Sequence, residues 1–296
     1  MNTDYLRNRD LQTLLSACVF MMMFCIGLDF SCAQWLRLMR SPRPIFVGLL
    51  IQNVGVPLVA FGIAWFLKDS PEVALAIILI AASPGGPVAN AIVHYAKARI
   101  DLSISLTVIN GLLCVFTAPL IADLGFVLIS GKDSGLALPF ADTVKHLIFI
   151  ILIPIVIGIT LNQFAPRAVQ RIRQATHHST LFLLVGTILI ILVVNRDAVY
   201  AGYQDAVPAL VVFSIAMVFL GVYVSRLSNL ADDFGFAIAN EVSIHNVPLA
   251  LLMANSILNK PELSGAIILY VPVIFSTTLL NAYLYKNHRG YSKVEA

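Results

Sequence analysis

The chain consists of long apolar segments separated by short polar ones. The apolar runs are about twenty residues long, the length that an α-helix needs to cross the hydrocarbon core of a bilayer. We expect nine such spans, at residues 11–31, 44–67, 72–97, 101–123, 143–164, 179–195, 206–225, 231–258 and 263–285. Because the connecting segments are short, residues 1–296 are expected to form a single transmembrane domain.

Two of these spans depart from a plain hydrophobic helix. The third contains Ala-Ser-Pro-Gly-Gly-Pro-Val-Ala-Asn at 82–90, and the eighth contains Asn-Glu-Val-Ser-Ile-His-Asn-Val-Pro at 240–248. Proline removes a backbone donor and glycine weakens a helix, so each run predicts an unwound segment between two half-helices. Inside a membrane such backbone is tolerated only where it is buried in protein or lines a cavity.

The two interrupted spans are similar to one another. Asn90 is followed after 26 residues by Phe116, and Asn246 after 29 residues by Phe275, in each case on the next apolar helix. Four spans lie between the two breaks, so the copies run in opposite directions. Paired broken helices in inverted repeats are typical of secondary transporters. We therefore expect a first, shortened repeat at 1–123 and a second repeat at 143–285.

Composition supports the membrane assignment. Apolar residues make up 59% of the chain, charged residues 12%, and the mean hydropathy is +0.87, which excludes a water-soluble globular domain. The net charge of +3 is small, and the basic residues are scattered without interleaved aromatic residues, so nucleic-acid binding has no support. Cys18, Cys25 and Cys32 share a helix face, but the chain has no clustered ligands for a metal other than sodium.

The charge distribution predicts the orientation. With the N-terminus outside, twelve Lys and Arg residues fall on the inner side and seven on the outer side, which favours a cytoplasmic C-terminus. The first apolar run lacks a clear cleavage site and is expected to be a retained span. The short tails favour the bacterial inner membrane as the location of this multi-pass protein.

Glu241 is the most informative single residue, because a carboxylate at bilayer depth costs roughly 2.5–3.5 kcal/mol on insertion scales. Such a residue normally holds an ion, a proton or a partner, and the structural alternative is a pair with a buried amide. Asn90 offers an amide oxygen at the other break, and Ser103 and Thr107 lie four residues apart on one helix face. Gln52, within the second span, predicts either an interhelical hydrogen bond or ion coordination.

At these residues the chain resembles the bile acid:sodium symporter family. The resemblance covers almost the whole chain and is carried by the following segments: Ile26 to Phe30, Gln52 with Pro57, Ser83 to Gly86 with Asn90, Tyr95 to Lys97, Leu102-Ser103 with Thr107, and Glu241-Val242 with Asn246. It implies a ten-helix inverted repeat with a panel domain and a core domain, in which two sodium ions bind where the broken helices cross. This chain then resembles a nine-helix member that lacks the opening helix.

The resemblance also implies the site residues. One sodium ion is expected at Asn90, Ser103, Thr107 and Glu241. A second ion is expected at Gln52, Glu241, the carbonyls of Val242 and Ile244, and His245. Two positions depart from the family pattern, because Ala89 replaces a common serine and His245 replaces a common glutamine. Since histidine titrates near neutral pH, a charged His245 would weaken the second site or make it pH-sensitive, whereas a neutral one would only replace a hydrogen bond.

The expected substrate is a small or amphipathic organic anion, since family substrates include bile acids, pyruvate and pantothenate-type compounds. The N-termini of the second half-helices, at 87–91 and 246–249, are expected to present free N–H groups to a carboxylate. The residues that we assign to substrate binding are Pro87, Ala89, Asn90 and Asn246.

These expectations combine into a sodium-coupled symporter that works by alternating access in the lipid bilayer and is not an enzyme. One alternative keeps the fold and uses protons, with Glu241 and His245 as carriers. A more distant alternative is an intramembrane enzyme, but Asp232-Asp233 is the only acidic pair and lacks the second cluster that such enzymes use. The sequence leaves open the particular anion, the number of sodium ions and the oligomeric state.

Overall fold

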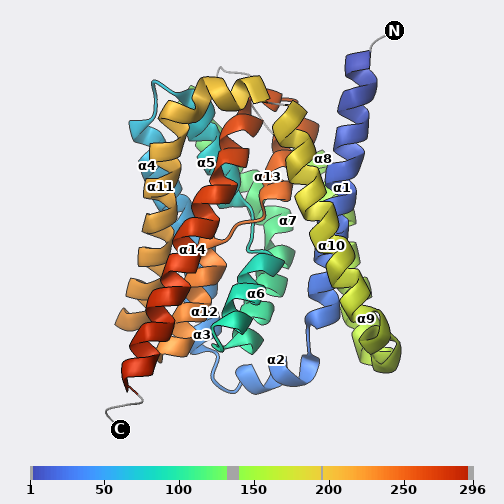
Figure 1. Cartoon of the computed structure of the whole chain (residues 1–296), viewed down its shortest axis with the longest axis vertical. Helices are drawn as coiled ribbons and strands as arrows, with labels where there is room; N and C mark the ends of the chain where they lie inside the picture. Colours follow the sequence, from blue (N-terminus) through green and yellow to red (C-terminus); the bar gives the residue numbers. More distant parts are fainter. Residues whose placement is uncertain (1–2, 132–139, 195, 293–296) are drawn as a thin grey trace.

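The computed structural model describes residues 3–131, 140–194 and 196–292, and these residues are nearly all helical (Figure 1). Within these described residues, seven helical segments are long and apolar enough to cross a membrane, at Asp10–Asp29, Arg43–Phe66, Ile100–Ile129, Phe140–Phe164, Pro166–Val194, Tyr203–Leu227 and Pro261–Asn287. The prediction of an all-α polytopic membrane protein is confirmed. The seven segments overlap seven of the nine expected spans, and the other two expected spans coincide with broken helices.

The helices follow one another with few long connections. The first half contains α1 (Thr3–Asp29), α2 (Cys32–Leu38), α3 (Arg43–Leu50), the π-turn η1 (Ile51–Gly55), α4 (Val56–Phe66), α5 (Pro71–Ala82), α6 (Pro87–Tyr95) and α7 (Ile100–Ser130). The second half contains α8 (Phe140–Leu147), the π-turn η3 (Ile148–Leu152), α9 (Ile153–Phe164), α10 (Pro166–Val194), α11 (Arg196–Leu227), α12 (Asp232–Ser243), α13 (Val247–Leu252), the π-turn η4 (Met253–Ile257), the 3₁₀ turn η5 (Pro261–Leu263) and α14 (Ser264–Ser292).

Both interrupted spans are broken within the polar runs that predicted an unwound segment. The backbone is extended at Ser83 and Gly86, between α5 and α6, and again at Ile244, between α12 and α13. Both following half-helices carry proline in their first turn, where its missing N–H costs nothing. The count of nine spans and the inverted repeat stay predictions, since no single helix continues through either break.

The two breaks cross and pair with each other near the middle of the molecule (Figure 1). Gly85 and His245 form an isolated antiparallel bridge, and the N–H of Asn246 donates to the carbonyl of Pro84 at 2.9 Å. Thus two segments that lie about 160 residues apart in the sequence share backbone hydrogen bonds. This pairing satisfies some of the polar groups that unwinding exposes.

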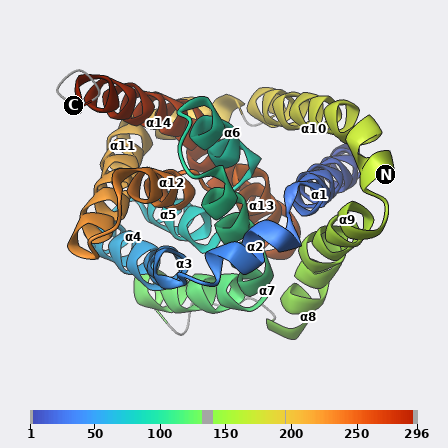
Figure 2. The ribbon, with the colours of Figure 1, turned by 90° about the horizontal axis from the view of Figure 1, so that it is seen from below.

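The helices form two groups, which Figure 2 shows side by side. One group, called here the four-helix layer, consists of α1, α8, α9 and α10, and the other, the broken-helix body, contains α3 to α7 and α11 to α14. Within the layer, α1 approaches α9 closely at Gly27 and Gly158, where each glycine lies against backbone atoms of the other helix. Small residues allow such close backbone contact between membrane helices.

We predict that Gly27→Ala destabilises the protein, because the added Cβ would overlap the carbonyl oxygen of Ile155 on α9. Overpacking of this kind costs about 1–3 kcal/mol, so the melting temperature of the purified protein should fall. The matched control is Gly186→Ala on α10, where no atom lies within 4 Å of the new Cβ. A melting temperature that is equally unaffected in both variants would contradict the close helix contact.

Candidate cation site

Glu241 lies two residues before the end of α12 and is fully buried. Its carboxylate lies directly against Gly85 of the other break, so closely that any Cβ at position 85 would overlap it. Gly85 therefore has a steric role: it lets the carboxylate reach the backbone of the crossing segment. The negative charge predicted from sequence is thus placed at the point where the two breaks pair.

The residues of the first expected ion site meet at this carboxylate. The Thr107 hydroxyl lies 2.8 Å from Glu241 Oε2, 2.9 Å from the Ser103 carbonyl oxygen and 3.3 Å from Asn90 Oδ1. The Ser103 hydroxyl lies 2.6 Å from the same Asn90 oxygen. The predicted grouping of Asn90, Ser103, Thr107 and Glu241 is therefore present in the structure.

The Thr107 hydroxyl lies near more acceptor oxygens than it can donate to. Each hydroxyl carries one proton, yet the Thr107 hydroxyl alone is within hydrogen-bond distance of three acceptor oxygens. At most one of those three contacts can be a hydrogen bond donated by Thr107. The buried carboxylate, amide and hydroxyl oxygens of this cluster are the kind of ligands that a hard cation such as Na⁺ prefers.

Gln52 approaches the crossing from η1, the π-turn between α3 and α4. Its amide nitrogen donates to the carbonyl of Ser83 at 3.4 Å, while Oε1 is buried and has no hydrogen-bond partner in the described part of the chain. Glu241 Oε1 is likewise buried and unpaired. An unpaired buried oxygen costs free energy, and a bound cation would remove that cost at both positions.

The break in α12 also frees two backbone carbonyls. The Asn246 N–H, which would pair with the Val242 carbonyl in a continuous helix, donates to Pro84 instead. The helical partner of the Ile244 carbonyl would be the N–H of residue 248, which is proline and has none. Both carbonyls expected in the second ion site have therefore lost their helical donors.

His245 is held in one tautomer by a short hydrogen-bond chain. The Tyr270 hydroxyl donates its single proton to the carbonyl of Ser243 at 2.7 Å, so its oxygen accepts from His245 Nδ1–H at 3.1 Å. In the neutral ring Nε2 then carries the lone pair, and this atom is buried without a hydrogen-bond partner among the described residues. The ring also contacts Phe213, with centroids 5.7 Å apart. Nε2 is thus free to accept a cation or a proton.

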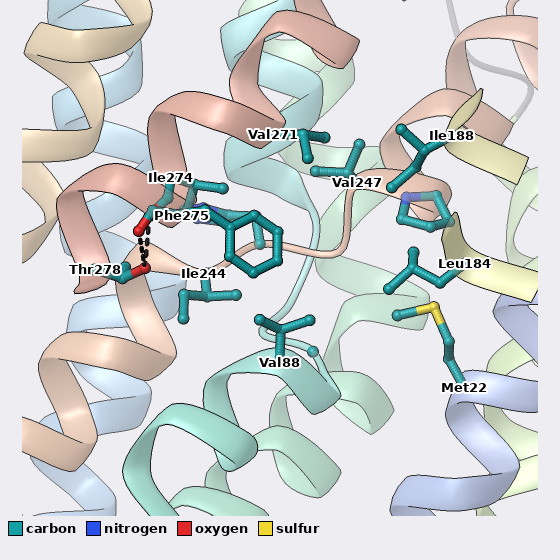
Figure 3. A pocket seen from close by; sticks show the side chains of 13 residues that line it. Met22, Val88, Leu184, Ile188, Ile244, Val247, Val271, Ile274, Phe275 and Thr278 are labelled. Atoms are coloured by element: carbon teal, nitrogen blue, oxygen red, sulfur yellow. Dashed lines mark hydrogen bonds between the residues drawn. The ribbon is translucent and has the colours of Figure 1, made fainter. Parts of the chain in front are cut away.

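A small cavity of about 40 Å³ lies between the two helix groups at the crossing (Figure 3). Met22, Leu184 and Ile188 line it from α1 and α10 of the four-helix layer. The broken-helix body contributes Gly86, Val88, Ile244, His245, Val247, Pro248, Val271, Ile274, Phe275 and Thr278. The lining is mostly apolar, and the cavity has room for only a few water molecules.

The four residues assigned to substrate binding do not line this cavity. Ala89, Asn90 and Asn246 are buried, and their neighbours Val88 and Val247 face the cavity instead. The expectation of free N–H groups is wrong at three positions, one of which is Asn246, whose N–H donates to the Pro84 carbonyl. Asn246 Oδ1 accepts the N–H of Leu249 at 3.1 Å, and the N–H of Ala89 donates to the carbonyl of Gly86. The assignment of Pro87, Ala89, Asn90 and Asn246 to the substrate stays a prediction.

Two polar residues at the site were missed by the sequence reasoning. Asn110 lies on α7 almost one turn after Thr107, is 1% exposed, and its side chain lies beside the Glu241 carboxylate. Its Oδ1 accepts from the Asn53 amide at 3.0 Å, which turns the Asn110 amide nitrogen away from Asn53. The spacing of Ser103, Thr107 and Asn110 on one helix face was the available signal. Nothing in the sequence pairs Tyr270 with His245.

Comparison with known proteins is consistent with this geometry. The family model described as the Sodium Bile acid symporter family matches residues 16–201. The Uncharacterized sodium-dependent transporter YocS of Bacillus subtilis is 27% identical over 79% of this chain and 71% of its own length. The Ileal sodium/bile acid cotransporter of Homo sapiens is 26% identical over 96% of this chain and 83% of its own length. The Probable sodium/metabolite cotransporter BASS2, chloroplastic, of Oryza sativa subsp. japonica is 25% identical over 81% of this chain and 56% of its own length.

We predict that Thr107→Val weakens sodium binding roughly tenfold or more, because interactions with a charged group contribute about 1.5–3 kcal/mol. Thr107→Ser keeps the hydroxyl and should retain most of the affinity. The measurement is the melting temperature of each purified variant as a function of sodium concentration at constant ionic strength. Equal sodium dependence in the wild type and Thr107→Val would exclude Thr107 from the site.

Proposed function

The chain belongs to the sodium bile acid symporter family, and on this premise we propose that it is a sodium-coupled symporter of a small or amphipathic organic anion that works by alternating access. Members and relatives are named as sodium-dependent transporters and cotransporters, not as enzymes. The single observation that carries the proposal is a pair of buried oxygens at the crossing of the two breaks, Glu241 Oε1 and Gln52 Oε1, which have no hydrogen-bond partner in the part of the chain that the structure describes.

Two ion positions share Glu241 in this proposal. The first uses Asn90, Ser103, Thr107 and Glu241, which the structure brings within hydrogen-bond distance of one another. The second uses Gln52, Glu241, the carbonyls of Val242 and Ile244, and His245, and it is supported by the unpaired atoms of Gln52 and His245. Sodium is cargo in this scheme, and one or two ions accompany each anion.

Coupling follows from the position of the carboxylate. Without an ion, a charged Glu241 is buried beside Gly85 with an unpaired oxygen, which disfavours movement of this site through the membrane interior. Sodium neutralises the charge and ties α12 to the α5–α6 break and to α7. We assign the broken-helix body to the core and the four-helix layer to the panel, and the two rock against each other along their largely apolar contact.

The anion is proposed to bind in the cavity between the two groups. That cavity is mostly apolar and too small for a drug-sized ligand, which needs roughly 300–1,000 Å³, so the helices around it must separate to admit a substrate. No Lys or Arg lines it. The negative group of the substrate would then be neutralised by bound sodium, and its apolar part would contact residues such as Leu184 and Phe275.

We also propose nine spans in two inverted repeats, at 1–123 and 143–285, in a bacterial inner membrane. Figure 1 supports an odd number of crossings, because the two termini lie at opposite ends of the molecule. The end that carries α2 and the C-terminus is assigned to the cytoplasm, and the N-terminus to the outside. The excess of basic residues at the α2 end supports this orientation.

Proton coupling is the second candidate, and the unpaired Nε2 of His245 is the observation that favours it. A proton that binds this atom from the transport pathway would have Glu241 as a nearby acidic partner. The two candidates share the fold and differ in the ion that drives transport.

We predict that Glu241→Gln abolishes sodium-driven uptake, since the neutral amide removes the charge that attracts the ion. The measurement is accumulation of radiolabelled pyruvate, pantothenate and taurocholate in proteoliposomes under an inward sodium gradient. Wild type should accumulate at least one of them, and only when sodium is present. Glu72→Gln, an exposed change in the first turn of α5, is the matched control and should leave uptake unchanged.

Uptake by Glu241→Gln that remains sodium-dependent would refute the role of Glu241. Uptake by wild type that a proton gradient drives without sodium would replace sodium coupling by the proton-coupled alternative. Failure of all three anions to accumulate under either gradient would contradict the proposed substrate class.

We predict that acidification weakens sodium binding more in wild type than in His245→Gln, because a protonated imidazole beside a cation site repels sodium. Glu241 is present in both proteins, so the difference between them reports on His245. The measurement is the sodium-dependent rise in melting temperature between about pH 5.5 and 8. An identical pH dependence in the two proteins would show that His245 only replaces a hydrogen bond.

A further inference from the structure

The short helix α2 lies across one end of the molecule, between α1 of the four-helix layer and α3 of the broken-helix body (Figures 1 and 2). Leu38 is buried, and the Trp35 ring packs near Phe30 with centroids 6.2 Å apart. Leu36 and Met39 are 65% and 44% exposed. A crosswise helix with exposed apolar side chains and neighbouring arginines is typical of the membrane interface.

Beside α2 lies a cavity of about 510 Å³, much larger than the one at the helix crossing. Its lining comes from α2 and its following turn, from the start of α7 and from the start of α12. The polar and aromatic residues of this lining are Gln34, Arg37, Ser41, Arg99, Asp101 and Phe234. The cavity is therefore shared by three segments that are distant in sequence, and none of its residues belongs to the ion site.

Arg99 is held in place at the wall of this cavity. Its Nε and one terminal nitrogen donate to the two carboxylate oxygens of Asp101, at 2.9 and 2.7 Å, and its guanidinium lies 4.2 Å from the centroid of the Phe234 ring. These two bonds use two of the five N–H groups of a guanidinium, so its remaining donors are positioned at little further entropic cost.

Arg37 supplies the second positive charge of the cavity, and it has no ion pair within the described residues. Two carboxylates lie nearby, Asp101, which is bonded to Arg99, and Asp233, which accepts the N–H of Phe234 at 3.0 Å. The surrounding end of the molecule is strongly basic, with ten Lys and Arg against four Asp and Glu in its described segments. The basic residues are Arg37, Arg40, Arg43, Lys97, Arg99, Arg167, Arg171, Arg173, Arg226 and Lys286, and the acidic residues are Asp29, Asp101, Asp232 and Asp233.

We infer that this cavity binds the phosphate headgroup of an anionic phospholipid from the adjoining leaflet. Arg37 and Arg99 contact the phosphate, Gln34 and Ser41 supply neutral polar groups, and the acyl chains lie against the exposed side chains of Leu36 and Met39. A lipid matches all three features, because it combines a negative headgroup, an interfacial depth and an apolar body. A free phosphate ion would leave the exposed apolar residues unexplained.

A headgroup bound in this cavity would link the two helix groups, which move against each other in the proposed transport cycle. Since α2 connects the two helix groups, a headgroup held between α2, α7 and α12 bridges the connecting segment and the broken-helix body. An anionic lipid is therefore expected to stabilise the arrangement in which these three segments are close together. This inference does not depend on which ion or anion is transported.

The test is the melting temperature of the detergent-purified protein with added phosphatidylglycerol, phosphatidylcholine or inorganic phosphate at equal ionic strength. Phosphatidylglycerol should raise the melting temperature of wild type more than phosphatidylcholine does. Arg37→Gln should weaken its apparent affinity roughly fivefold, as expected for loss of one basic residue near a lipid surface. Arg99→Lys, which keeps the charge but loses the planar fork, should also weaken it.

The matched control is Lys68→Gln, because Lys68 lies over the Trp65 ring near the opposite end of the molecule and should not contribute. An equal effect of the two lipids, or an unchanged effect of phosphatidylglycerol in both Arg37→Gln and Arg99→Lys, would overturn the proposal. Full stabilisation by inorganic phosphate alone would also overturn it, since the site would then recognise a free anion rather than a lipid.

Discussion

The fold depends on how the backbone groups at the two helix breaks are satisfied inside the membrane. In a hydrocarbon environment each unpaired N–H or carbonyl costs several kcal/mol, so an unwound segment persists only where other groups take over its hydrogen bonds. The breaks meet this demand partly by pairing with each other, as the Asn246 N–H bond to Pro84 and the bridge between Gly85 and His245 show. The Gln52 amide adds a donor to the Ser83 carbonyl.

This mutual satisfaction is incomplete: among the described residues, side-chain oxygens as well as the amide nitrogens of Asn110 and Asn246 remain without a hydrogen-bond partner. At the starts of the two second half-helices, the N–H of Leu249 donates to Asn246 Oδ1, and the N–H of Ala89 donates to the carbonyl of Gly86. Two side-chain oxygens, Glu241 Oε1 and Gln52 Oε1, have no hydrogen-bond partner among the described residues, and the carbonyls of Val242 and Ile244 have lost their helical donors. Buried carboxylate, amide and carbonyl oxygens are the ligands that a hard cation prefers, and this supports the proposed ion site. We therefore propose that the same residues that break the helices also prepare the position for sodium.

Much of the fold and of the candidate ion site could be predicted from the sequence, because the helix breaks and the shared helix faces depend on residues that are close together in the chain. The prolines and glycines of the first break, Pro248 at the second break, and the four-residue spacing of Ser103 and Thr107 report on the backbone and the helix face within a few residues. The features of the site that the sequence did not predict depend on hydrogen bonds between segments that are distant in the chain. Asn110 gains its orientation from Asn53 on another helix, and His245 gains its tautomer from Tyr270 on α14. The N–H groups expected to be free at 89 and 249 donate instead to acceptors three residues earlier in the chain, the Gly86 carbonyl and Asn246 Oδ1, so this expectation failed for a local reason.

The most direct test of the central claim, a cation site built at the crossing of the breaks, needs no substrate. It is the thermal unfolding of the wild-type protein in sodium chloride against potassium chloride at equal ionic strength. A ligand that binds only the native state must raise its melting temperature by mass action, so the account predicts a higher melting temperature in sodium that grows with its concentration. Identical melting temperatures in the two salts at every concentration would contradict it.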